Sequence, residues 1–133
     1  MNKRILPLLI ALLCLSISNL MAQAPQLINY QAVVRNNAGQ PVASGTPVSL
    51  RFTIHDASST GTVAFQEIQN DTANQFGLVT VQIGSVTSLT TVDWGLNSKY
   101  LQVELALNNS GNYTDMGTSQ LLSVPYALFA GNV

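Results

Sequence analysis

Apolar and polar side chains alternate with a period of two along several stretches of the chain. The clearest stretch is 48–55, where every even-numbered residue is apolar and every odd-numbered residue is polar. Residues 101–107 repeat the pattern, residues 79–83 show a shorter form, residues 28–34 begin the series, and Val63 with Phe65 mark a weaker stretch. These stretches are rich in β-branched and aromatic residues, so we predict that each is a strand with one buried face.

Segments rich in Gly, Asn, Asp and Ser separate the predicted strands. They lie at 36–39, 56–61, 74–77 and 108–112, and Gly and Asn tolerate the positive φ that tight turns require. No convincing amphipathic helix lies between the strands. The pattern therefore predicts an all-β fold, a single antiparallel β-sandwich of about seven strands with an Ig-like or prealbumin-like architecture.

The C-terminal segment 120–131 departs from this pattern because it is apolar almost throughout and contains Pro125. Such a segment needs a surface that covers its side chains. Two arrangements remain open: the segment packs back on the sandwich, or it forms a junction to another element, to another surface-protein segment or to a second copy of the chain. Pro125, Tyr126 and Phe129 are its candidate interaction residues.

The first 22 residues have the order of a secretory signal peptide. Lys3 and Arg4 precede an apolar run at 5–15, and Ala22 offers a small residue for cleavage. A membrane anchor is the alternative, but the run is shorter than the ~20 residues that span a bilayer. We therefore expect a cleaved leader at 1–22, a domain at 23–133 with no membrane span, and a secreted, extracellular or outer-cell-surface location, or the periplasm.

The amino-acid composition argues against several classes of structure and function. The only cysteine, Cys14, lies in the predicted leader, so no disulfide is expected in the mature domain. Without Lys3 and Arg4 the chain has three basic and six acidic side chains, which gives a net charge of −3. Affinity for nucleic acid depends on neutralising phosphates with Lys and Arg, so no nucleic-acid partner is expected.

Residues with catalytic or metal-binding potential are few and scattered. His55 and Asp56 lie near Ser58 and Ser59, but adjacent residues of a strand point to opposite faces and do not form a catalytic dyad. A single histidine and no mature cysteine give no zinc spacing, and the oxygen clusters around Asp56 and Asp71 lack the spaced carboxylates of a calcium loop. The sequence predicts no enzyme, no metal site and no cofactor, with a small secreted enzyme as the weakest alternative.

The carboxylates show no spacing that selects a pair for glycoside hydrolysis. Among them, Glu67 lies on the same strand face as Val63 and Phe65. A bulge or a strand end at Glu67 is the simpler interpretation of a carboxylate in that position.

Three aromatic residues, Trp94, Tyr100 and Tyr113, occupy predicted loop or strand-edge positions. Exposed rings commonly bind sugars and protein surfaces, so these residues are candidate interaction residues and polysaccharide is a candidate ligand. The alternative for Trp94 is that its large ring closes one end of the sandwich.

Several motifs together resemble a known module. They are the stretches 28–35 and 74–78, the pair Asp93-Trp94 and, most specifically, residues 116–128. Over its whole mature length the chain is similar to the N-terminal domain of secreted and cell-surface proteins of Bacteroidota, in which the module often precedes collagen-like, fibre-like or coiled-coil stalks. This sequence stops at Val133, where such chains commonly run on. The resemblance implies an extracellular structural or adhesive role and carries no catalytic residues.

Two weaker likenesses concern the fold and a modification. Residues 36–48 and 72–78 look similar to transthyretin-like (prealbumin-like) repeats of outer-surface proteins, and Asp71-Thr72-Ala73 resembles a short O-glycosylation acceptor motif.

From the first resemblance and the lack of catalytic residues, we expect a non-enzymatic, adhesin-like structural module, with an extracellular carbohydrate-binding module as the alternative.

Overall fold

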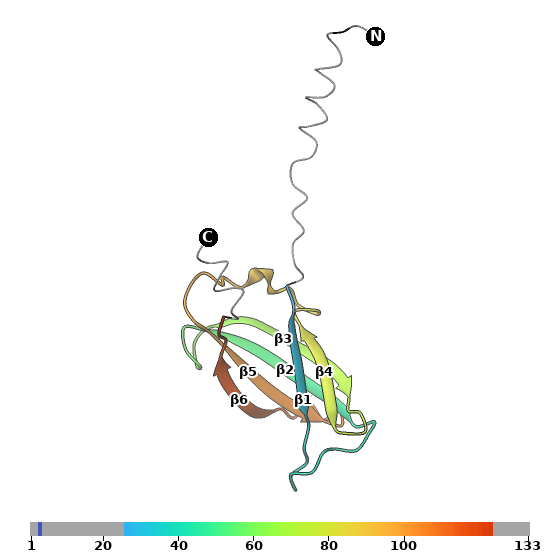
Figure 1. The fold of residues 1–133 in the computed structure, drawn as a ribbon. Helices are drawn as coiled ribbons and strands as arrows, with labels where there is room; N and C mark the ends of the chain where they lie inside the picture. The colour runs from blue at the N-terminus through green and yellow to red at the C-terminus, as the bar shows by residue number, and fades with distance from the viewer. Residues whose placement is uncertain (1–2, 4–25, 124–133) are drawn as a thin grey trace.

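The computed structural model describes Lys3 and residues 26–123. The strands are β1 (Ile28–Val33), β2 (Pro47–Asp56), β3 (Val63–Thr72), β4 (Leu78–Ile83), β5 (Lys99–Leu107) and β6 (Thr114–Gln120), with one short 3-10 helix, η1 (Leu89–Thr91). All pairings are antiparallel: β1 pairs with β4, while β3, β2, β5 and β6 form a second sheet in that order (Figure 1). The predicted all-β antiparallel sandwich is confirmed, with six strands in this part of the chain where about seven were expected.

Some of the predicted features lie outside the described residues. They are the leader at 1–22 apart from Lys3, and the three candidate interaction residues Pro125, Tyr126 and Phe129.

The inner face of the four-stranded sheet is centred on β2. Its apolar residues alternate as the sequence predicts, and Phe52 and Ile54 are fully buried. Tyr30 of β1 contacts Phe52 edge to face, with ring centroids 5.0 Å apart and an interplanar angle of 71°. Full burial of a large apolar side chain stabilises a fold by roughly 1.5–3 kcal/mol. This aromatic pair therefore makes a large contribution to holding the two sheets together.

The stretch predicted as weak is the ten-residue strand β3. The register of β2 against β3 shifts between Ile54 and His55, so Val63 is exposed and the buried face of β3 begins at Phe65. The expected bulge or strand end at Glu67 is wrong, because Glu67 lies in the middle of β3, is paired with Phe52 and is buried. The irregularity lies nearer the start of the strand and leaves the alternation around Glu67 intact.

Strand β6 was not predicted, because residues 114–120 show no alternation of apolar and polar side chains. It lies at the edge of the four-stranded sheet, and six of its seven residues are exposed. An edge strand with two open faces has no requirement for an apolar face. Its pairing with β5 shifts between Gln102 and Glu104, near Gly117 with φ +119°.

The outer face of the four-stranded sheet is joined by polar side chains across the strands. Ser49 donates to Asn70 at 2.6 Å, and Gln66 donates to Thr53 at 3.0 Å. These cross-strand bonds satisfy the hydroxyl groups of Ser49 and Thr53, which are buried although they point away from the apolar core.

Candidate functional site

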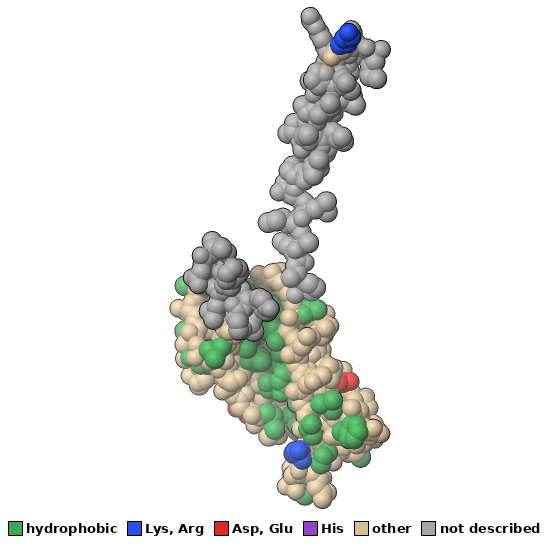
Figure 2. Space-filling view, in the orientation of Figure 1, with side chains coloured by type: hydrophobic (Ala, Val, Ile, Leu, Met, Phe, Trp, Pro, Cys, Tyr) green, Lys and Arg blue, Asp and Glu red, His purple; other side chains and the backbone are tan. Residues whose placement is uncertain are grey.

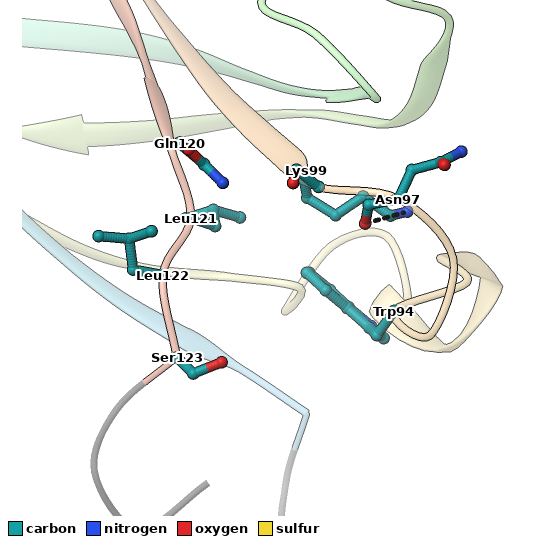
Figure 3. Close-up of a pocket in the computed structure, with 8 residues that line it drawn as sticks. Trp94, Asn97, Lys99, Gln120, Leu121, Leu122 and Ser123 are labelled. Atoms are coloured by element: carbon teal, nitrogen blue, oxygen red, sulfur yellow. Dashed lines mark hydrogen bonds between the residues drawn. The ribbon is translucent and has the colours of Figure 1, made fainter. Parts of the chain in front are cut away.

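Strand β1 begins and β6 ends at the same end of the sandwich (Figure 1), and a group of apolar side chains borders the hollows there. We call it the Trp94 face, and it consists of Leu27, Leu89, Trp94, Leu121 and Leu122. Leu89 is buried, whereas Trp94 is 43% exposed and Leu122 is 79% exposed. Trp94 borders two hollows, one lined by residues 120–123 with Lys99 and the other by residues 26–28 with Leu89. Figure 3 shows Trp94 on one side of the first hollow and Leu121, Leu122 and Ser123 on the other.

Glu67 fixes the start of the loop that carries Trp94. Its Oε1 accepts the backbone N–H of Gly84 at 2.9 Å, and its Oε2 accepts those of Thr87 at 2.9 Å and Val86 at 3.3 Å. The side-chain amide of Gln69 donates to Oε1 at 2.6 Å. A buried polar group is tolerated when it is fully hydrogen-bonded. The carboxylate of Glu67 therefore links the middle of β3 to the loop that leads into η1.

Lys99 fixes the other end of the same loop. Its buried Nζ donates to Asp56 Oδ1 at 2.6 Å and to the backbone oxygens of Leu96 and Asn97. The side-chain amide of Asn97 also donates to Asp56, at 3.2 Å. The hydrogen bond from Lys99, followed by that from Asn97, holds the pKa of Asp56 below its ordinary value. The ion pair thus joins the end of β2 to the start of β5, and the hydrogen bonds of Lys99 and Asn97 attach the loop to both strands.

These two sets of contacts hold the loop 84–98 at both ends. Between them, the indole Nε1 of Trp94 donates to the backbone oxygen of Leu89 at 3.3 Å, and Leu89 is packed in the core. An aromatic ring that is fixed before binding loses little conformational entropy when a partner arrives. The Trp94 face is therefore a preorganised and partly apolar surface, and Trp94 both borders the end of the sandwich and remains open to a partner.

Tyr100 and Tyr113 lie on a different surface, since neither lines the hollows beside Trp94. Tyr100 is part of β5, on the outer face of the four-stranded sheet. The ring of Tyr113 covers the Arg51 guanidinium, whose Cζ is 4.2 Å from the ring centroid. Arg51 in turn binds Glu104 through two hydrogen bonds of 2.6 Å, which hold the pKa of Glu104 below its ordinary value. The Tyr113 ring thus already contacts Arg51 of the same chain, so less of the ring is available to a partner.

The residues weighed for catalysis and metal binding have other partners. The two ring nitrogens of His55 contact the backbone oxygen of Gly61 at 2.9 Å and the side-chain oxygen of Gln102 at 2.8 Å, while Asp56 pairs with Lys99. The carboxylate of Asp71 accepts backbone N–H groups of Thr72 and Thr80. Within residue 3 and residues 26–123, no three His, Cys, Asp or Glu side chains are grouped to hold a metal ion.

Sequence reasoning missed the structural roles of Glu67 and Lys99. A signal was present for Glu67, because its position on the buried face of an alternating strand placed a carboxylate in the core. For Lys99 the signal was weaker. It is the first residue of β5, and alternation along the strand places it on the same face as Leu101 and Val103.

Comparison with known proteins identifies one family. The family described as a domain of unknown function (DUF8740) matches residues 29–120, a span that runs from the second residue of β1 to the last residue of β6. No curated protein and no solved structure matches the chain. In the part of the chain that the structure describes, there is no helix of the length and apolar character that would cross a membrane.

Proposed function

The chain belongs to the DUF8740 family, and we infer that it is a non-enzymatic structural or adhesive module that is secreted or displayed at the cell surface. Its C-terminal segment, 120–131, docks on a neighbouring element or on a partner copy and so connects the sandwich to its surroundings. The leader-like residues 1–22 and the resemblance to surface proteins of Bacteroidota support this location and role.

The observation that carries the proposal is the Trp94 face. It presents apolar side chains at the point where the chain leaves β6, and the next residues, 124–130, are almost entirely apolar. Exposed apolar side chains that adjoin an apolar segment mark an interaction surface. The loop that bears Trp94 is held by Glu67 and by the Lys99–Asp56 ion pair, which is the arrangement expected of a rigid docking surface.

Truncation after Ser123 tests this proposal. The chain that ends at Ser123 is expected to unfold at a lower urea concentration than the full chain, or to lose a self-association that the full chain shows by analytical ultracentrifugation. A matched control replaces residues 124–133 with a Gly/Ser segment of the same length, which separates the loss of apolar contacts from the loss of chain length. Equal unfolding midpoints and the same oligomeric state in all three proteins would refute the docking role of the segment.

A carbohydrate-binding module is the second candidate, and the exposure of Trp94 favours it. Polar side chains of Asn97, Lys99 and Gln120 line the hollow beside the ring, and this combination of a ring with polar groups suits a sugar. Because Trp94 is the single tryptophan of the chain, its fluorescence reports on this hollow directly. A saturable change in emission on adding polysaccharide, together with a binding heat by calorimetry that Trp94→Ala abolishes, would support this function, and no change with a broad set of glycans would dismiss it.

A further inference from the structure

We propose that residues 124–129 of this chain form a seventh strand that adds to the free edge of β1 and runs parallel to it. The proposal deepens the proposed function, because it names the surface on which the C-terminal segment docks. It rests on three features of the described residues: an open strand edge, an uncovered apolar face beside that edge, and the position of Ser123.

The open edge belongs to β1. In residues 26–123, β1 pairs with β4 along one side and with no strand along the other. The sequence of β1 is INYQAV, without charge or proline. Sheet edges are normally protected from further pairing by charges, prolines or bulges, and β1 has none of these.

The other three sheet edges, those of β3, β4 and β6, are less open, and β3 carries the acidic residues Glu67 and Asp71. The far edge of β4 is engaged by β3 side chains, because Asp71 accepts the N–H of Thr80 at 3.0 Å and Gln69 donates to the backbone oxygen of Gln82. The pairing of β6 with β5 shifts register, which interrupts β6, and Asp115 accepts the N–H of Gly117 at 2.9 Å. The edge of β1 is therefore the one best suited to accept a strand.

The inner face of the four-stranded sheet is uncovered next to this edge. Leu105 and Leu107 of β5 are only partly buried. Ser119 and Thr114 of β6, which pair with Leu101 and Leu105 and so share their face, are exposed. Figure 2 shows apolar side chains along the side of β1 that faces β6. A strand placed ~4.8 Å from β1 would cover this face.

The C-terminal segment begins at the correct end of this edge. Trp94 borders both the hollow lined by residues 121–123 and the hollow lined by residues 26–28, so Ser123 lies near the start of β1. Six extended residues span about 20 Å, which is the length of the six-residue β1. A segment of the same chain also has a far higher effective concentration than the segment of another copy. These points favour the chain's own residues as the occupant.

The proposed pairing has a definite register. If Val124 lies beside Ile28, then Tyr126 lies beside Tyr30 and Leu128 beside Ala32. Ile28, Tyr30 and Ala32 are the partly buried residues of β1, so Val124, Tyr126 and Leu128 would face the sheet and cover the exposed part of β5. Pro125 falls on the opposite face near the start of an edge strand, where a proline is tolerated. The chain would then enter the sandwich at the Trp94 face and leave it at the other end.

A disulfide trap tests the register and the occupant together. In the full chain with Cys14→Ser, the pair Ala32→Cys and Leu128→Cys places two thiols on neighbouring strands and the same face, within the Cα separation that a disulfide allows. The matched control, Ala32→Cys with Ala127→Cys, places the second thiol on the opposite face. The expected result is a disulfide in a protein of monomeric mass, formed at least about tenfold faster than in the control.

Two outcomes would overturn the inference. A disulfide-linked dimer would assign the edge to a second copy, and equal oxidation rates in both pairs would show that residues 124–129 do not lie along β1. If truncation after Ser123 still lowered stability in the second case, the docking role of the segment would stand and only the β1 site would be rejected.

Discussion

Replacement of Glu67 by glutamine tests whether this residue fixes the loop that carries Trp94. The two carboxylate oxygens accept three backbone N–H groups and one side-chain amide, at 2.6 to 3.3 Å. Glutamine keeps the shape but has one acceptor oxygen, and its NH2 group would face N–H donors. About two part-buried donors would lose their partner, at about 1–2 kcal/mol each. Allowing for partial relaxation, Glu67→Gln is expected to lower the free energy of unfolding by about 2–4 kcal/mol.

Urea unfolding measures this loss, and the fluorescence of Trp94 shows whether the loop moves. With an m-value of about 1.5 kcal/mol/M, the midpoint would fall by roughly 1.3–2.7 M, and the native emission of Trp94 would shift because Leu89 and the indole are displaced together. Asp115→Asn, on the exposed edge strand β6, is the matched control and should change stability by less than about 0.5 kcal/mol. A change at Glu67 as small as that of the control, with unaltered emission, would refute the role assigned to Glu67.

Four further predictions follow from the described contacts. The pKa of Glu104 is lowered by Arg51, so the stability from this pair is present above the unfolded pKa of about 4.3 and is lost as pH falls through the folded value. The free energy of unfolding of Glu104→Gln should therefore depend less on pH in acid than that of the unaltered chain. An unchanged pH dependence would contradict this. Phe52→Ala should cost about 3–5 kcal/mol in urea unfolding, and a loss below about 1 kcal/mol would contradict its place in the core. Gly84→Ala should lower stability and shift Trp94 emission, because φ at Gly84 is +98° and a Cβ atom would lie 2.8 Å from the backbone oxygen of Gln26. Unchanged stability and unchanged emission would contradict that close approach. Thr72 is exposed and is expected to carry a glycan, so the intact mass of the secreted protein should exceed that of Thr72→Val by more than the substitution accounts for; a difference equal to the substitution alone would contradict this.

Alternation along the chain was sufficient to predict the strands that have one buried face. Residues 48–55 and 101–107 form the centre of the sheet as β2 and β5, because a period of two fixes which side chains face the core. The same rule found no signal in residues 114–120, since an edge strand with two open faces needs no apolar face.

The candidate site was predictable only in part. Trp94 was identified as an aromatic residue in a loop, and its exposure of 43% leaves its ring open to a partner. Its supports were not predictable, because they join residues far apart in the chain: Glu67 binds the N–H of Thr87, and Lys99 binds Asp56. A local pattern contains no information on such pairs. It shows that a polar residue falls on a buried face, but not which groups satisfy it.

Amide hydrogen exchange of β1 reports on the strand edge on which the C-terminal segment is proposed to dock. Exchange at Ile28–Val33 would be compared between the full chain and the chain that ends at Ser123, under conditions in which both are folded. The β1 amides that point away from β4 are expected to be protected in the full chain and to exchange at least about tenfold faster after truncation, while the amides paired with β4 change little. Equal exchange of the outward-pointing amides in both proteins would contradict the claim that residues 124–129 complete the sandwich.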